Sequence, residues 1–122
     1  MLATLESITD ADGAWSIELA KKAAMDSRCR GLSVANAARL IDALLAYHDC
    51  TDDPLAMKLA GLYARQGLRT IYTQDGRFAA MEKSSGHVHS ITSSLSGIAS
   101  YAVRSNDAEM LASCRRIMET GV

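Results

Sequence analysis

The chain has 122 residues, of which 48% are hydrophobic and 22% charged, a composition typical of one globular domain rather than of a disordered tail. Its 13 basic and 14 acidic residues leave a net charge of -1, and Lys and Arg are scattered, so we expect no nucleic-acid partner. No apolar run is long enough to span a membrane, so we expect no membrane partner either.

The first ten residues lack the basic and apolar regions of a signal peptide. Cys29, Cys50 and Cys114 are odd in number and far apart, without a C-x-x-C pair. We therefore expect three small, buried thiols rather than a disulfide framework or a zinc site. These features favour a cytoplasmic protein that holds no metal or other cofactor.

The apolar periodicity predicts two helices in the first half of the chain. One follows Asp12-Gly13 and covers about 14–27. The second, over 33–50, shows the i, i+3, i+4, i+7 pattern most clearly, and Ser33 is its expected N-cap. Because this second helix is apolar around most of its circumference, we expect it to be covered on more than one side.

A third helix is predicted over 53–72. Asp53 is suited to cap it and Pro54 to its first turn, where a missing N–H costs nothing. The short connection from the preceding helix predicts an antiparallel hairpin. Asp75-Gly76 then predicts a turn with short extended flanks.

A second pair of helices is predicted over 88–104 and 107–120, with Asn106-Asp107 as the cap between them. The two pairs match at one constant shift along the sequence, in both their caps and their apolar positions. The matched positions include Tyr47 with Tyr101, Asp53 with Asp107, Leu44 with Ile98, and Gly67 with Gly121. The sequence therefore predicts an all-α fold of antiparallel helical hairpins repeated at about 54 residues.

Repeats of this kind bury their faces by stacking on neighbours, and here the stack is short. We therefore expect the single domain, 1–122, to be a segment of a longer repeat protein or a truncated member of one. Some inner apolar side chains should lie uncovered and permit self-association, and the candidates are Leu44, Leu45, Ile98 and Ala99.

The most unusual local composition is the Ser-, Gly- and His-rich run from Ser84 to Gly97. His87 and His89 lie where a helix begins, and Gly86 precedes them. Free N–H groups at a helix start favour oxygen-rich ligands, and imidazoles hydrogen-bond sugar hydroxyls or move a proton near neutral pH. Glu82 is the nearest candidate acid. The alternative is a structural histidine cap, and a metal site is disfavoured because no carboxylate or Cys lies at ligand spacing.

Other polar and aromatic residues have adequate structural explanations. His48 is expected to be a structural histidine on an apolar stripe, and Asp75 a turn residue. Trp15 and Tyr72 are expected to pack in the core rather than stack on a sugar. The chain has no Gly-rich phosphate loop, nucleophile elbow or Ser/His/Asp order.

The run from Ala38 to Ala60 resembles the repeat helices of (α/α) toroid carbohydrate enzymes. The segments 75–78 and 86–98 resemble β-L-arabinofuranosidase-type glycoside hydrolases (family 127). The resemblance implies a partial (α/α) toroid in which Gly86, His87 and His89 face a sugar-binding pocket. No segment matches the cysteine nucleophile and zinc-binding Cys/Glu cluster of that family, so the resemblance implies a glycoside hydrolase-like, carbohydrate-binding domain without the catalytic motif.

Two alternatives stay open at this point. One is a non-catalytic helical-repeat module for protein interaction, although no tetratricopeptide signature is present and the repeat is longer than is common. The other is a related lyase or unsaturated-uronide hydrolase that uses other residues of the same toroid.

Overall fold

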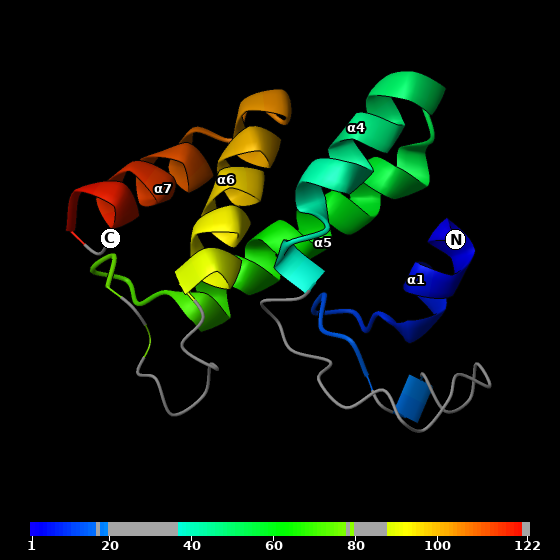
Figure 1. Ribbon diagram of the computed structural model, residues 1–122, viewed down its shortest axis with the longest axis horizontal. Coiled ribbons are helices and arrows are strands. Elements are labelled where there is room, and N and C mark those ends of the chain that lie inside the picture. The colour runs from blue at the N-terminus through cyan, green and yellow to red at the C-terminus, as the bar shows by residue number, and fades with distance from the viewer. Residues whose placement is uncertain (17, 20–36, 78, 80–87, 121–122) are drawn as a thin grey trace.

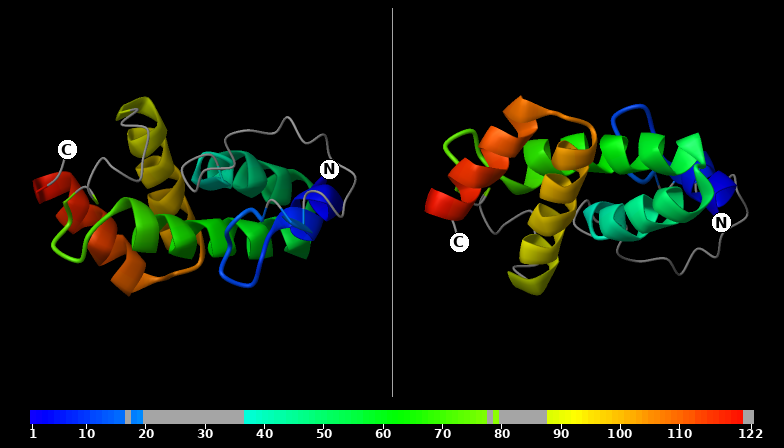
Figure 2. Two further views of the ribbon diagram at one scale, coloured as in Figure 1. Left: turned by 90° about the horizontal axis from the view of Figure 1, so that it is seen from below. Right: turned by 90° about the horizontal axis from the view of Figure 1, so that it is seen from above.

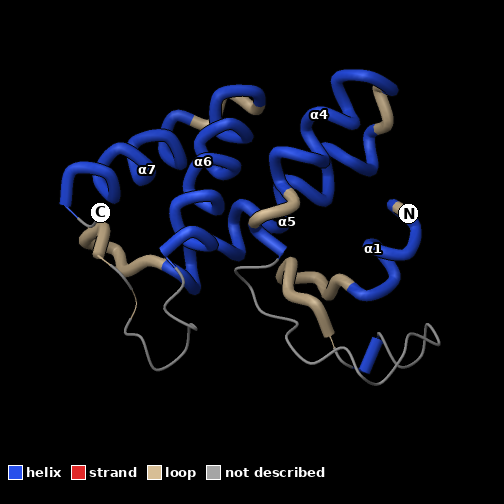
Figure 3. The backbone as a smooth tube through the Cα atoms, viewed as in Figure 1, coloured by secondary structure: helices blue, strands red, loops and turns tan. Residues whose placement is uncertain are grey.

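The computed structural model describes residues 1–16, 18–19, 37–77, 79 and 88–120. This part of the chain is all-α, as predicted, and consists of helices joined by loops (Figures 1 and 3). The five helices are α1 (Leu2–Ile8), α4 (Ile41–Thr51), α5 (Pro54–Ile71), α6 (Val88–Arg104) and α7 (Ala108–Thr120).

Helices α4 and α5 form the first antiparallel pair. Asp52 between them adopts a left-handed conformation, with φ of 54°. The Asp53 carboxylate accepts the Leu55 N–H at 2.9 Å, and Pro54 opens α5, so both predictions for this turn are confirmed. The two-residue link brings α5 back along α4.

The start of α4 differs from the prediction. The helix begins at Ile41 rather than at Ser33, which lies outside the described residues. Just before it, the Leu40 N–H bonds to the Ala37 carbonyl at 3.0 Å in a tight turn. Residues 37–38 are helical as well, so the break lies at Arg39 and Leu40, where the Ala38 carbonyl comes close to Gly97 of α6.

Helices α6 and α7 form the second pair, at the predicted positions. Asn106 in the connection is left-handed, with φ of 55°. The Asp107 carboxylate accepts the Met110 N–H at 2.9 Å, as its predicted role as a cap requires. Both inter-helix turns therefore use a left-handed residue followed by an aspartate cap.

Helix α6 packs on both α4 and α5, which brings the two pairs together (Figure 2). Gly97 permits this close approach, because a Cβ atom there would lie 2.9 Å from the Ile41 Cβ. At Gly61 of α5, an added Cβ would lie 2.8 Å from Cζ of the Tyr101 ring. Two glycines thus set how closely α6 approaches the first pair.

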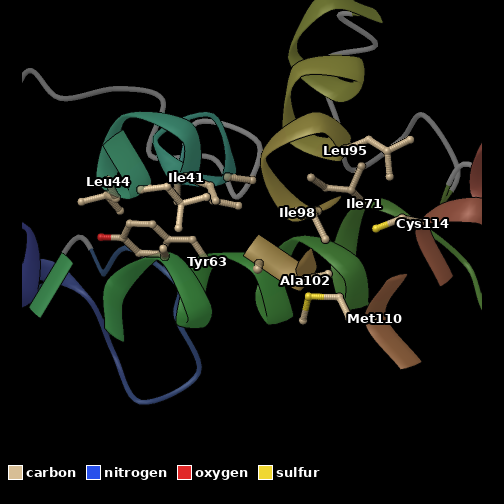
Figure 4. Close-up of a cluster of buried hydrophobic side chains, with 14 of the residues drawn as sticks. Ile41, Leu44, Tyr63, Ile71, Leu95, Ile98, Ala102, Met110 and Cys114 are labelled. Carbon is tan, nitrogen blue, oxygen red and sulfur yellow. The ribbon is translucent and has the colours of Figure 1, made fainter. Parts of the chain in front are cut away.

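The core lies between these four helices (Figure 4). Leu44, Leu45 and Ile98 are at most 3% exposed, so the prediction that they lie uncovered is wrong. The reason is that α6 crosses both helices of the first pair and covers their inner faces. Ala99 is partly exposed. The large apolar side chains that remain exposed in the described helices are instead Tyr47, Val103, Leu111 and Met118.

The N-terminal residues form α1, which no sequence pattern predicted and which packs on α5. The predicted helix over 14–27 is wrong at its start, because Trp15 pairs with Thr9 in an isolated antiparallel bridge. The Asp10 carboxylate accepts the N–H groups of Asp12 and Ala14, each at 2.9 Å, which fixes a turn at this point. Residues 17 and 20–27 lie outside the described part.

The predicted turn at Asp75-Gly76 is confirmed. The Thr73 N–H bonds to the Arg77 carbonyl at 2.8 Å, and Gly76 adopts a φ of 87°. Beyond the turn, the Ala79 N–H donates a hydrogen bond to the Ile71 carbonyl at 3.0 Å. The turn is thus held to the end of α5 by backbone bonds.

Within the described ranges, no helix combines the length and the hydropathy that crossing a bilayer requires.

Loss of the cap on α7 is expected to weaken the fold measurably. Asp107→Ala removes the acceptor for the Met110 N–H, and such changes cost about 1 kcal/mol of unfolding free energy. Asp107→Asn keeps an acceptor at the same place and should retain most of that stability. Urea denaturation followed by circular dichroism compares the two variants. Equal stability of the alanine variant and the parent would contradict the assigned cap.

Candidate functional site

The predicted sugar site is only partly covered by the structure. Glu82, Gly86 and His87 lie outside the described residues, so their convergence stays a prediction. His89 lies in the first turn of α6 and is exposed. Its backbone carbonyl accepts the Thr92 hydroxyl at 3.4 Å, which belongs to the helix itself. Of the four predicted residues, the structure therefore describes His89 alone, at the surface.

The structural explanations given to two aromatic residues are confirmed. Tyr72 is 4% exposed, and its hydroxyl donates to the Ile91 carbonyl at 2.9 Å. Burial raises the pKa of Tyr72 to about 12. Trp15 packs on the core, and its ring meets Tyr63 edge-on at 6.1 Å between centroids. Neither ring is placed to stack on a sugar.

Two polar residues weighed from the sequence also have local partners. The Asp75 carboxylate accepts the Thr73 hydroxyl and lies 3.5 Å from Arg77. The Thr73 bond holds the pKa of the Asp75 carboxyl below its usual range, as expected of a turn residue. His48 is half-buried on α4, with Nδ1 4.0 Å from the Asp49 carboxylate.

A polar pocket of about 790 Å³ lies between the end of α5, the turn after it and α7. Its charged residues are Arg69, Glu109 and Arg116. Both arginines brace loops: Arg116 donates to the Gln74 carbonyl at 3.0 Å, and Arg69 to the Asp12 carbonyl at 2.9 Å. Two of the three charged residues of this pocket therefore also hold loops on the helices.

A second hollow is a groove of about 560 Å³ between α6 and α7. Its lining is mainly apolar, and Arg115 is the one charged residue in it. The lining residues are Thr92, Leu95, Ser96, Ala99, Leu111, Cys114, Arg115 and Met118. Leu111 is 36% exposed and Met118 is 61% exposed, so this groove opens large apolar side chains to solvent. We call it the α6/α7 groove.

The described residues provide no catalytic constellation. They hold no cluster of three or more His, Cys, Asp or Glu side chains able to bind a metal ion. Cys114, at the base of the groove, is buried, and burial raises the pKa of its thiol to about 11, so it is a poor nucleophile near neutral pH.

Comparison of the chain with protein-family models, with curated proteins and with solved structures finds no match. The resemblance to toroid glycoside hydrolases therefore stays a prediction carried by its motifs.

Sequence reasoning missed the α6/α7 groove, although a signal was present. The larger apolar residues in the sequence of the last predicted helix, 107–120, are Met110, Leu111, Cys114, Ile117 and Met118. Together they make a stripe that is wider than one neighbouring helix can cover. In the structure Met110, Cys114 and Ile117 are buried, whereas Leu111 and Met118 are exposed. The surplus width indicated a second contact surface.

The cysteines are expected to differ sharply in reactivity. Cys50 is exposed, so the prediction that all three thiols are buried is wrong at this position, whereas it is confirmed at Cys114. In a Cys29→Ser background at pH 8, iodoacetamide should alkylate Cys50 at least about tenfold faster than Cys114, since only exposed thiols with accessible thiolate react readily. Mass spectrometry of proteolytic peptides measures both rates. Equal rates would contradict the burial of Cys114.

Proposed function

We propose that the protein is a helical-repeat interaction module whose α6/α7 groove binds an amphipathic helix. The observation that carries this proposal is the exposure of Leu111 and Met118 in a groove whose lining is mainly apolar. Exposed apolar patches on soluble proteins mark interaction sites, and a groove between two helices is suited to a third helix.

The two inter-helix turns support a repeat of the hairpin in the register that the sequence predicts. The left-handed residues Asp52 and Asn106 match in this register. In the turn before each of them, a hydroxyl bonds back to a tyrosine carbonyl: Thr51 to Tyr47 at 2.8 Å and Ser105 to Tyr101 at 2.9 Å. The first residues of α5 and α7, Pro54 and Ala108, match at the same shift.

The position of the groove within this register indicates what it binds. Helix α6 contacts the first pair at Ala38, Ile41 and Gly61. Their counterparts one repeat later are Thr92, Leu95 and Arg115, and all three line the α6/α7 groove. The groove therefore corresponds to the surface on which α6 itself lies, and a helix with a similar face is its expected partner.

A stapled helical peptide of residues 91–105 tests this function. It presents the face with Gly97 and Tyr101, which contacts the first pair. NMR titration should shift the methyl signals of Leu95, Leu111 and Met118, since these line the groove. A peptide carrying Gly97→Glu, which cannot approach closely, serves as the control. Absence of shifts, or shifts confined to the polar pocket at α5, would show that the groove is not a helix site.

The carbohydrate-binding function implied by the resemblance is the second candidate. In it, the hairpins belong to a partial (α/α) toroid, and His87, His89, Glu82 and Gly86 bind sugar. The exposure of His89 in the first turn of α6 favours it. Isothermal titration with a panel of plant and bacterial glycans tests it, and a His87→Ala/His89→Ala variant should bind at least about tenfold more weakly than the parent. Equal binding by both proteins, or binding of no glycan by the parent, would exclude this candidate.

A further inference from the structure

One apolar surface is used neither by the fold nor by the groove. On α4, Ala43, Ala46, Tyr47 and Cys50 are all exposed, and Tyr47 is 39% exposed. Their spacing of i, i+3, i+4 and i+7 puts them on one face of the helix. We call this face the α4 stripe. The helix was expected to be covered on more than one side, and the stripe is the side that the described residues leave open.

The α4 stripe occupies the register of the contact face of α6. The shift that takes Tyr47 to Tyr101 also takes Ala43, Ala46 and Cys50 to Gly97, Ser100 and Arg104. Gly97 and Tyr101 are the residues by which α6 approaches Ile41 and Gly61. The positions that α6 uses for contact with a preceding hairpin are therefore displayed outward on α4.

We propose that the α4 stripe of one copy of the chain docks into the α6/α7 groove of a second copy, head to tail. Within one copy, α6 packs on α4 and α5. In the proposed contact, α4 of one copy packs in the same way on α6 and α7 of the next. This inference rests on the proposed function, since it uses the same groove, and it names the partner as a second copy of this protein.

The side chains that would meet are complementary. Tyr101 lies over Gly61, so its counterpart Tyr47 would lie over Arg115, where a guanidinium and an aromatic face attract one another. Helix α4 carries Asp42 and Asp49 and no Lys or Arg, whereas the charged residue of the groove is Arg115. Because Asp49 already pairs with Arg104 in the same copy, Asp42 is the carboxylate of α4 that adds negative charge beside the stripe.

One ion pair within a copy corresponds to an apolar contact between copies, when the residues are matched at the repeat shift. Within one copy, Arg104 and Asp49 join α6 to α4 by an ion pair of 2.8 Å. Their counterparts between copies are Cys50 and Val103, and both are exposed in the single chain. Ala43 stands where α6 has Gly97, so the two helices would dock slightly farther apart than α6 and α4 do.

The two surfaces differ from one another, so their pairing leaves one of each free at the two ends of an open assembly. Helices α4 and α7 lie toward opposite sides of the molecule in both views (Figures 1 and 2). One copy can therefore engage two neighbours. A single helix laid in a groove buries less than the roughly 1,600 Å² of a standard interface, so we expect association at about 10 μM to 1 mM.

Sedimentation velocity on the whole chain, from about 10 μM to 1 mM, tests the proposal. The parent should form dimers and longer species as concentration rises. Met118→Glu in the groove and Tyr47→Glu in the stripe should each be monomeric at the highest concentration, because each retains only one of the two surfaces. An equimolar mixture of these variants should form a dimer and nothing longer, since the intact surfaces pair once. Leu111→Glu and Ala43→Glu form a second pair of variants, and circular dichroism confirms that each is folded.

Two control substitutions at Glu109 test whether assembly depends on the groove and the stripe specifically. Glu109→Lys alters charge on α7 at the polar pocket, away from the groove, and should assemble as the parent does. In a Cys29→Ser background, Val103→Cys should give an oxidised ladder of copies linked through Cys50, and Glu109→Cys should not.

Three results would overturn the inference: a parent that is monomeric at the highest concentration, assembly unaffected by the groove variants, or a mixture of blocked variants that stays monomeric. A monomeric parent whose groove still binds the stapled peptide would remove the second copy as partner and leave the proposed function standing. A groove that binds neither the peptide nor a second copy would contradict both the proposed function and this inference.

Discussion

Ile98→Ala is expected to lower the free energy of unfolding by about 2–5 kcal/mol, the usual range for truncation of a fully buried aliphatic side chain. Ile98 is 0% exposed and lies on the face of α6 toward the first pair. Its Cδ1 atom approaches Gly67 of α5, where an added Cβ would lie 3.1 Å away. The truncation therefore opens a cavity between α5 and α6, where the close approach of the backbones leaves little room to collapse.

Val103→Ala is the matched control, because it removes an aliphatic side chain from the same helix at a position 64% exposed. Val103→Ala should change the free energy of unfolding by no more than about 0.5 kcal/mol. Urea unfolding at low micromolar concentration, where the chain is expected to be monomeric, measures both. If Ile98→Ala cost no more than Val103→Ala, the packing of α6 on the first pair would be wrong.

Tyr63→Phe is expected to lower the free energy of unfolding by about 1–3 kcal/mol, because it removes the centre of a partly buried hydrogen-bond chain. The Trp15 indole N–H donates to the Tyr63 hydroxyl at 3.0 Å. That hydroxyl bonds to the Thr9 hydroxyl at 2.8 Å, and Thr9 donates in turn to the Leu5 carbonyl at 2.6 Å. The phenylalanine leaves the indole N–H without its acceptor while preserving the ring.

The single tryptophan provides the readout of this change. Its fluorescence in Tyr63→Phe should show greater quenching by acrylamide, since the segment around Trp15 is held less firmly on α5. Tyr47→Phe is the control, because that tyrosine is exposed on α4. Equal unfolding midpoints and equal quenching in the two variants would refute the hydrogen-bond chain as a tether.

The sequence predicted the elements whose signals are local. The caps at Asp53 and Asp107 and the turn at Asp75-Gly76 were read from residue types that satisfy backbone groups within a few positions, and all three are confirmed. The start of α4 was not predictable in this way. The break before it, at Arg39 and Leu40, lies beside the contact of Ala38 and Ile41 with Gly97, which belongs to the other hairpin and lies far along the sequence.

The candidate site was predicted less well, for a related reason. His89 and its neighbours stood out by composition, which says nothing of what converges on them in space. The α6/α7 groove arises because Leu111 and Met118 lie on the flank of α7 that α6 does not cover. The crossing angle of two helices decides which flank a neighbouring helix covers. The apolar periodicity of one helix carries no information about that angle.

The attachment of the N-terminal segment to Tyr63 has a consequence for the chain during its synthesis. Thr9 and Trp15 reach a tyrosine that lies 54 and 48 residues later in the sequence. They leave the ribosome well before α5 exists, so their contacts wait until that helix has emerged, whereas each hairpin closes across a short link. Until then, the Trp15 indole N–H and the Thr9 hydroxyl lack the partner that Tyr63 provides in the folded chain.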